Sequence, residues 1–121
     1  MASILLVADD DWVRNDVEAA LLDPDVKLTV ERDPRAAARL VREERFDWAI
    51  VDLQIGSMGG MAVVRMLRSA IVGGQIADLG IVLLLDRDAD TFLARRAGAD
   101  AAIVKPFTAQ QLRGRLTVAT G

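Results

Sequence analysis

Short hydrophobic runs alternate along this chain with longer stretches in which apolar residues recur at helical spacing. The hydrophobic runs predict five strands, at residues 3–8, 26–30, 48–51, 81–85 and 101–104. The amphipathic stretches predict five helices, at residues 12–22, 35–45, 61–71, from a cap at Asp88 or Asp90 to Gly98, and 108–116. Such strict alternation is typical of an α/β fold, in which a doubly wound parallel sheet carries helices on both faces.

The predicted strands differ in how much of their surface is expected to be covered. Residues 48–51 form a continuous apolar run, which is typical of a strand covered on both faces. Residues 26–30 instead alternate between apolar and polar side chains, so we expect this strand at an edge of the sheet. The two tryptophans, Trp12 and Trp48, are both expected to be partial packing anchors.

Length and composition limit the class of protein. The chain has 121 residues, 52% of them hydrophobic, so we expect a single domain over residues 1–121 with a core of its own. No apolar run is long enough to span a membrane, and no basic segment leads an apolar one at the N-terminus. We therefore expect a cytoplasmic protein without a membrane segment. The net charge of −3 does not favour direct binding to nucleic acid.

The absence of two residue types narrows the chemistry. The chain contains no cysteine and no histidine. Disulfides, Cys/His metal sites and catalysis by a Ser-His or Cys-His pair are therefore excluded. Any metal must be held by oxygen atoms, which favours magnesium, calcium or manganese.

Charged residues stand where three of the predicted strands end. Asp9 and Asp10 follow the first strand, Asp52 follows the third, and Lys105 follows the fifth. Ligands bind at the carboxyl ends of the strands in an open parallel sheet, so these side chains predict a site for a hard cation and a phosphoryl group. Taken singly, each has a plainer interpretation. Asp10 or Asp11 can cap the next helix, and Asp52 can be an ordinary loop aspartate.

Three segments carry a resemblance to a known family. They are residues 4–11 (ILLVADDD), residues 47–53 (DWAIVDL), and residues 97–107, which hold Ala-Gly-Ala-Asp and then Val-Lys-Pro-Phe. In these segments, and in their order and separation, the chain resembles the receiver domain of two-component response regulators from residue 3 to about residue 116. The resemblance implies a flavodoxin-like (β/α)5 fold with strand order 2-1-3-4-5.

The resemblance also implies a role for each charged residue. Asp52 would accept a phosphoryl group from the phosphohistidine of a sensor histidine kinase or phosphotransfer protein. Asp10 and Asp52, with the backbone carbonyl of Gln54, would hold Mg²⁺ directly, and Asp9 would act through a bound water. Lys105 would place a compact positive charge on a phosphoryl oxygen. The peptide bond between this lysine and the proline after it is cis in the family.

The chain departs from the family at the residues that relay the signal. The family has a Ser or Thr at the end of the fourth strand, where Leu85 stands here, and an aromatic residue on the fifth strand, where Ala102 stands. Asp86 occupies a position where a small residue is usual, and its carboxylate is expected to repel a phosphoryl group. The acceptor residues are therefore retained while the usual relay is missing.

Several functions remain open at this point. The first is a phosphoacceptor receiver, which is not an enzyme beyond its own phosphorylation and autodephosphorylation. The second is a pseudo-receiver that binds proteins without taking phosphate. An aspartate-nucleophile phosphatase would need a second acid where Gln54 stands, and a flavin module would need a phosphate loop where the run of aspartates at 9–11 lies.

Partner surfaces are expected from the resemblance as well. In the family, the fourth helix, fifth strand and fifth helix form the usual contact surface for an output domain or partner protein. A homodimer through this surface is one hypothesis, and Arg95, Arg96 and Arg113 are candidates to line it. The sequence leaves open whether the chain is a stand-alone receiver or a piece of a longer regulator.

Overall fold

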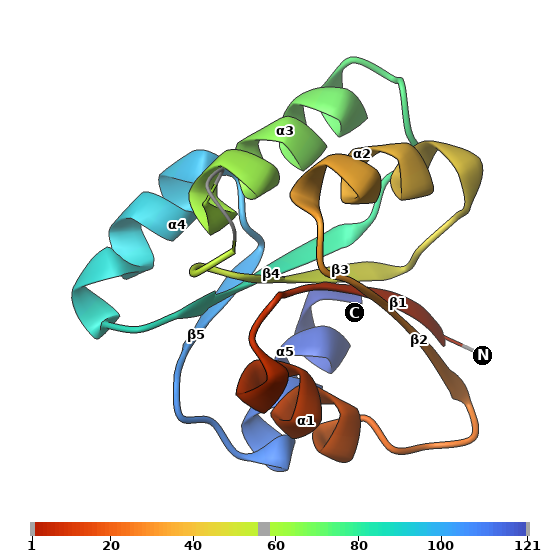
Figure 1. The fold of residues 1–121 in the computed structure, drawn as a ribbon. Helices are drawn as coiled ribbons and strands as arrows, with labels where there is room; N and C mark the ends of the chain where they lie inside the picture. Colours follow the sequence, from red (N-terminus) through yellow and green to blue (C-terminus); the bar gives the residue numbers. More distant parts are fainter. Residues whose placement is uncertain (1, 56–58, 121) are drawn as a thin grey trace.

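The structure is a computed structural model that describes residues 2–55 and 59–120, with side chains described as far as residue 116. Its centre is one parallel sheet of five strands in the order β2-β1-β3-β4-β5 (Figure 1). The strands are β1 (Ala2–Val7), β2 (Val26–Glu31), β3 (Trp48–Asp52), β4 (Gly80–Leu85) and β5 (Ala101–Val104). The predicted fold class and strand order are confirmed, and β2 lies at an edge of the sheet as its alternating pattern predicts.

Five α-helices connect and follow the strands. They are α1 (Asp11–Ala20), α2 (Pro34–Glu43), α3 (Gly60–Val72), α4 (Thr91–Ala97) and α5 (Ala109–Thr120). A short 3-10 turn, η1 (Asp88–Asp90), leads into α4, so this helix begins later than a cap at Asp88 would place it. Among the helices that the structure describes, none combines the length and apolar character needed to cross a membrane.

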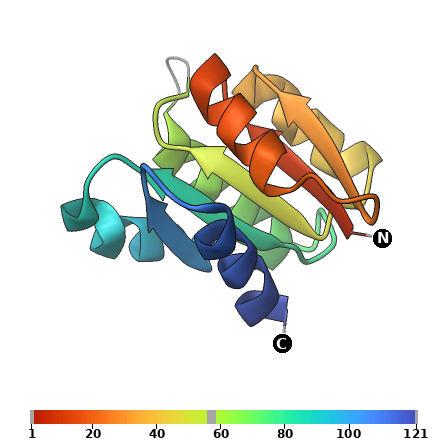
Figure 2. The same ribbon diagram turned by 90° about the horizontal axis from the view of Figure 1, so that it is seen from below.

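The helices cover the two faces of the sheet unequally. Helices α2, α3 and α4 lie on one face, and α1 and α5 lie on the other (Figures 1 and 2). Alternate residues of each strand feed the two cores: in β1, Leu5 and Val7 face α2 and α3, whereas Ile4 and Leu6 face α1 and α5. Because both faces are covered, all five residues of the central strand β3 are buried.

The turn between α4 and β5 is fixed by an arginine from α3. Gly98 ends α4 with φ +110, a left-handed conformation that glycine adopts without strain. Arg68 donates from Nε to the carbonyl of Gly98 at 2.9 Å and from Nη2 to Asp100 at 2.8 Å. The carboxylate of Asp100 also accepts the backbone N–H of Ile81 at 2.8 Å, which ties the start of β5 to the start of β4.

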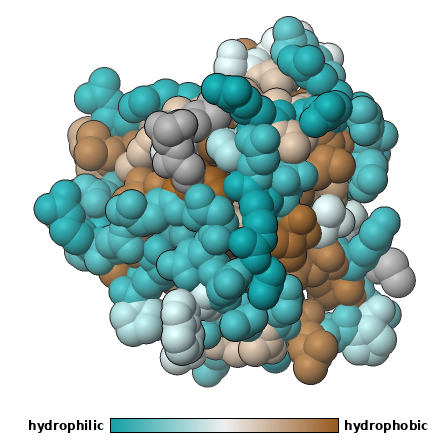
Figure 3. Space-filling view, viewed as in Figure 1, coloured by the Kyte–Doolittle hydropathy of each residue, from teal (hydrophilic) through white to brown (hydrophobic). Residues whose placement is uncertain are grey.

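The outer surface is mostly hydrophilic on the face seen in Figure 3. The large hydrophobic side chains that are exposed are spread along the chain: Trp12, Leu22, Val72, Phe92 and Leu93. The two tryptophans behave differently from one another. Trp48 is 3% exposed and packs in the core, while Trp12 is 80% exposed, so the expectation that both anchor the packing is wrong for Trp12.

Candidate functional site

Asp52 is the last residue of β3. Among the described residues it is the one charged residue that is buried, and none of its surface is exposed. Its position is set by the sheet: Asp52 lies opposite Leu84 of β4, and the next residue, Leu53, donates its N–H to the carbonyl of Leu84 at 3.0 Å. Since β3 is the middle strand of the sheet, Asp52 lies at the middle of the edge formed by the carboxyl ends of the strands.

Lys105 reaches Asp52 from two strands away. The ladder between β4 and β5 continues one residue past β5, because the N–H of Lys105 donates to the carbonyl of Leu85 at 2.8 Å. From there the ammonium Nζ donates to Oδ1 of Asp52 at 2.6 Å. The peptide bond between Lys105 and Pro106 is cis, as the resemblance implies. Two of the predicted site residues, separated by 53 positions in the chain, are thus in direct contact.

Only one oxygen of the Asp52 carboxylate is well satisfied. Oδ1 accepts from Lys105 and, at 3.4 Å, from the backbone N–H of Gln54. Oδ2 is buried and accepts no hydrogen bond from any described residue. Burial raises the pKa of Asp52 above its usual value, and the ammonium of Lys105 offsets only part of that effect. An ionised carboxylate with one bare oxygen is suited to receive a cation.

Asp86, the residue that follows β4, contacts this pair. Its Oδ1 lies 3.1 Å from Nζ of Lys105, and its Oδ2 accepts from the side-chain amide of Gln54 at 3.0 Å. The hydrogen bond from Gln54, followed by the contact with Lys105, lowers the pKa of Asp86. Burial works against the charge on Lys105, but Asp52 and Asp86 together raise the pKa of its ammonium. Lys105 is therefore a stable cation held between two carboxylates.

The two aspartates after β1 are placed less closely. Asp10 is the N-cap of α1, and its Oδ1 accepts the N–H of Trp12 at 2.8 Å, which is the capping role left open by the sequence. Asp9 is exposed at the end of the strand. Within residues 2–55 and 59–120, no three acidic side chains come close enough to form a metal cluster. The metal roles of Asp9, Asp10, Asp52 and the Gln54 carbonyl stay predictions.

Glycine 60 allows the chain to turn tightly behind Asp52. The N–H of Gly60 donates to the carbonyl of Leu53 at 2.9 Å, and α3 begins at this residue. A Cβ placed on Gly60 would collide with the carbonyl oxygen of Asp52 and with Cα of Leu53. The start of α3 is thus packed directly against the backbone that carries the buried carboxylate.

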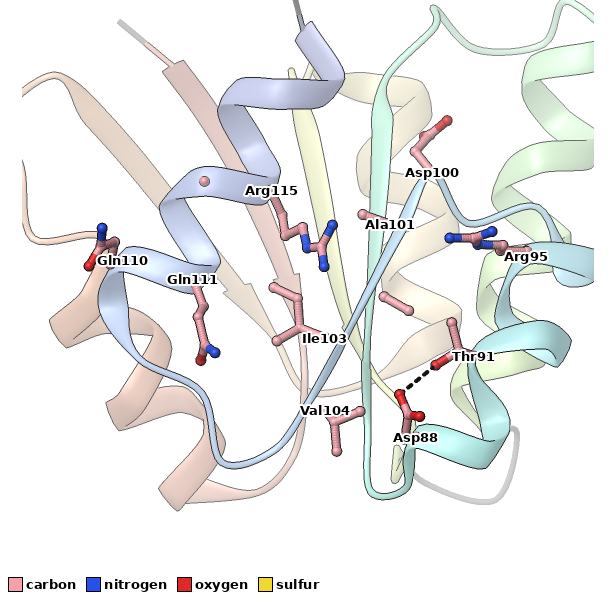
Figure 4. A pocket seen from close by; sticks show the side chains of 12 residues that line it. Asp88, Thr91, Arg95, Asp100, Ala101, Ile103, Val104, Gln110, Gln111 and Arg115 are labelled. Atoms are coloured by element: carbon pink, nitrogen blue, oxygen red, sulfur yellow. Dashed lines mark hydrogen bonds between the residues drawn. The ribbon is translucent and has the colours of Figure 1, made fainter.

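The two positions expected to relay a signal have no polar side chain. Leu85 is fully buried in the core beneath α2, α3 and α4, and Ala102 is half-buried on β5 and packs against the same core. Beside Ala102 a groove of about 570 Å³ runs along β5 between α4 and α5. Figure 4 shows Arg115 extending from α5 toward β5, with Arg95 on α4 at the opposite side.

Comparison with known proteins agrees with this geometry. The family model for the response regulator receiver domain matches residues 4–117. The chain belongs to the response regulator receiver family. As a receiver domain it is part of two-component signalling, in which receivers accept phosphate from histidine kinases.

Individual relatives show how far the likeness extends. The transcriptional regulatory protein AfsQ1 of Streptomyces coelicolor is 30% identical over 118 residues, which cover 96% of this receiver and 50% of AfsQ1. The BeF3-activated receiver domain of RstA from Klebsiella pneumoniae superposes with a TM-score of 0.80 at 29% identity, covering 96% of each chain. The receiver domain of sensor histidine kinase PA1611 from Pseudomonas aeruginosa, with a magnesium ion in its active-site cleft, shares the fold with a TM-score of 0.81 at 24% identity, over 97% of this chain and 95% of that one.

The curated relatives are longer proteins, and this chain spans about half of their length. Their activities outside the shared segment therefore do not transfer to it.

Two contacts of Asp86 lie beyond the sequence-based predictions. The sequence predicts that its carboxylate faces the site and repels a phosphoryl group, but not that it contacts Lys105 or accepts a hydrogen bond from the side chain of Gln54. The signal was available in part, because Asp86 directly follows β4 at the same sheet edge as Asp52 and Lys105. The side-chain direction of Gln54 carries no pattern that a single sequence displays.

Proposed function

We propose that this receiver domain accepts a phosphoryl group on Asp52 from the phosphohistidine of a sensor histidine kinase or phosphotransfer protein. The observation that carries the proposal is the buried carboxylate of Asp52, with Lys105 at 2.6 Å from one oxygen and no described partner on the other. In the transfer, a carboxylate oxygen forms a bond to phosphorus while the bond from phosphorus to the imidazole nitrogen breaks. The product is an acyl phosphate and a free histidine on the donor.

The two oxygens of Asp52 have different surroundings and are assigned different roles. We assign Oδ2, which accepts no hydrogen bond from any described residue, to Mg²⁺. Oδ1, beside the ammonium of Lys105, is then the oxygen that takes the phosphoryl group. When bound, Mg²⁺ supplies positive charge that offsets the repulsion between the carboxylates and the incoming group. Asp10 and the backbone carbonyl of Gln54 would supply further oxygen ligands, and Asp9 would act through a bound water.

Lys105 has a second task in this proposal. Without metal its ammonium already balances the charge of Asp52, so the site is kept assembled before a donor arrives. During transfer the same ammonium can move from the carboxylate of Asp52 to a phosphoryl oxygen and donate a hydrogen bond to it. Catalysis by this chain is then confined to its own phosphorylation and autodephosphorylation, and rests on positioning and charge neutralisation.

A second candidate function is a pseudo-receiver that binds proteins without accepting phosphate. The observation that favours it is the contact of Asp86 with Lys105. The carboxylate of Asp86 lies 3.1 Å from the ammonium and so competes with a phosphoryl group for it. The replacement of a hydroxyl residue by Leu85 and of an aromatic residue by Ala102 points the same way. In either function the groove between α4, β5 and α5 is the surface proposed for an output domain, partner protein or second copy.

Calorimetry with Mg²⁺ and then beryllofluoride, an acyl-phosphate mimic, separates the two functions. The phosphoacceptor proposal expects saturable binding of both ligands to the wild type and loss of both in Asp52→Ala. Asp78→Ala is the matched control, because Asp78 lies just before β4 and is exposed. Absence of binding to the wild type, or equal binding to Asp52→Ala, would reject the phosphoacceptor function and leave the pseudo-receiver.

A further inference from the structure

Lys105 is shared between two carboxylates that lie at the ends of different strands. Its Nζ lies 2.6 Å from Oδ1 of Asp52 at the end of β3 and 3.1 Å from Oδ1 of Asp86 just after β4. The Lys105 side chain is 20% exposed and that of Asp86 is 41% exposed, so solvent reaches the second contact but not the carboxylate of Asp52. Two of the three donors of the ammonium are therefore engaged before any ligand arrives.

Asp86 is itself held in place. The side-chain amide of Gln54, two residues after Asp52, donates to Oδ2 of Asp86 at 3.0 Å. Each oxygen of the Asp86 carboxylate thus has its own partner, one directly after β5 and one in the turn after β3. The carboxylate bridges the ends of three strands and cannot turn away without losing both contacts.

A phosphoryl group on Asp52 is incompatible with this arrangement. The group would bring negative charge to Oδ1, close to the carboxylate of Asp86, and like charges at such distances repel. It would also draw on the Lys105 ammonium, for which Asp86 is the competitor already in contact. Binding of a phosphoryl group must therefore weaken the contact between Lys105 and Asp86.

We propose that Asp86 is a latch residue, which holds Lys105 in the resting receiver and is released when Asp52 carries a phosphoryl group. The proposal rests on the proposed phosphoacceptor function. Asp86 is a positioning residue, since it acts on the phosphoryl group through Lys105. Its release supplies a route for the signal that needs neither a hydroxyl at Leu85 nor an aromatic ring at Ala102.

The route leads to α4 because of where Asp86 stands. Asp86 stands two residues before η1, which leads into α4, and the residue between them, Arg87, is paired with Asp90 at 3.1 Å. When Asp86 leaves Lys105 and Gln54, the segment at the start of α4 loses its attachments to the ends of β5 and β3. Helix α4 borders the groove along β5, so a change there alters a surface on which a partner can dock.

Beryllofluoride affinity in saturating Mg²⁺, measured by calorimetry, tests the latch with Asp86→Asn. This change removes the charge but keeps the shape of the side chain and its capacity to accept from Gln54. The matched control is Asp88→Asn, which removes the same charge two residues further along the chain. The carboxylate of Asp88 accepts a hydrogen bond from the hydroxyl of Thr91. An exposed ion pair and the added repulsion predict a gain in affinity of about three- to tenfold for Asp86→Asn and none for Asp88→Asn.

Each outcome of this titration decides the question. Measurable binding by the wild type, together with tighter binding by Asp86→Asn alone, supports the latch. Binding by Asp86→Asn where the wild type does not bind overturns it, because the wild type is then not a phosphoacceptor. Equal affinity of Asp86→Asn and wild type, or an equal gain in Asp88→Asn, overturns the latch and leaves the phosphoacceptor function standing. If none of the three proteins binds beryllofluoride, the phosphoacceptor function fails and the latch fails with it.

A second measurement separates the latch from a merely structural role. In amide NMR spectra of the free proteins, Asp86→Asn should move the signals of residues 87–97 part of the way toward their positions in the beryllofluoride-bound wild type. Asp88→Asn should not move them along that path. Shifts confined to the residues adjoining position 86 would contradict the proposed release of α4.

Discussion

Nζ of Lys105 lies 2.6 Å from Oδ1 of Asp52, while Oδ2 of the same carboxylate is buried without a hydrogen bond from any described residue. Lys105 therefore satisfies one of the two oxygens of a carboxylate that is buried at the end of β3. A buried acceptor without a partner costs about 1–3 kcal/mol of stability. The receiver accepts that cost at a position where an apolar residue would have packed with the rest of β3.

The first prediction follows from this cost. Asp52→Asn removes a charge whose burial outweighs its attraction to Lys105, with little change of shape, so we expect it to raise the free energy of unfolding by about 1 kcal/mol in metal-free buffer. Urea denaturation followed by circular dichroism measures the change. Asp78→Asn, at an exposed aspartate before β4, is the control and should leave the stability as it is. A loss of stability in Asp52→Asn would show that the Lys105 contact outweighs the buried oxygen.

The second prediction concerns pH. Burial raises the pKa of Asp52 in the folded protein above 3.8, so the folded state binds more protons than the unfolded state in the window just above that value. The stability of the wild type should therefore fall, relative to Asp52→Asn, as the pH rises through the folded pKa. The contribution of Lys105, whose pKa is raised from 10.5, is lost only as the pH rises above that value and lies outside this window.

Urea titrations of both proteins from about pH 3.5 to neutral, in the presence of a chelator, measure this difference. The advantage of Asp52→Asn should be smallest at the acid end and level off toward neutral pH. A difference that does not vary with pH would mean that Asp52 titrates alike in the folded and unfolded chains.

Much of the fold could be predicted from the sequence because the pattern of buried positions is regular. The run at residues 48–51 and the alternating run at 26–30 predict the central strand and the edge strand, and the sheet bears both out. The meeting of Asp52 and Lys105 also follows from their places after parallel strands. These features depend on backbone periodicity and topology, which a single sequence displays well.

Side-chain directions were predicted less well, for a physical reason. The expected packing of Trp12 is wrong because Asp10 caps α1, and the helix then begins with Trp12 on its exposed side. The contacts of Asp86 likewise depend on the direction of its side chain, which turns the carboxylate toward Lys105. Such choices are made between rotamers, and no spacing in the sequence encodes them.

The third prediction concerns the turn behind Asp52. In Gly60→Ala the new methyl group would collide with the backbone of Asp52 and Leu53, which cannot move as a side chain can. We expect a loss of about 1–3 kcal/mol in unfolding free energy, as in other overpacked sites, and weaker Mg²⁺ binding. Gly114→Ala is the matched control, because a Cβ there meets nothing within 4 Å among the described residues.

Gly114 lies inside α5, so its replacement by alanine should stabilise the protein by up to about 1 kcal/mol. Thermal and urea unfolding of both variants provide the comparison. Equal stability of Gly60→Ala and wild type would show that α3 can move away from β3 without cost.

The fourth prediction tests the groove along β5. Ala102 lines this groove and is half-buried, so a tyrosine ring at this position has space beside the strand. Ala102→Tyr should change the unfolding free energy by less than about 1 kcal/mol. Ala94→Tyr, at a fully buried position of α4, should instead unfold the protein or destabilise it severely. Strong destabilisation by Ala102→Tyr would show that the groove is closed to an aromatic ring.

The most direct test of the account is the mass of the intact protein after incubation with acetyl phosphate and Mg²⁺. The wild type should gain one phosphoryl group, and the gain should be absent in Asp52→Asn and without Mg²⁺. Asp78→Asn, at an exposed aspartate before β4, should be phosphorylated like the wild type. A wild type that gains no phosphoryl group, or an Asp52→Asn variant that gains one equally well, would contradict the assignment of Asp52 as the phosphoacceptor.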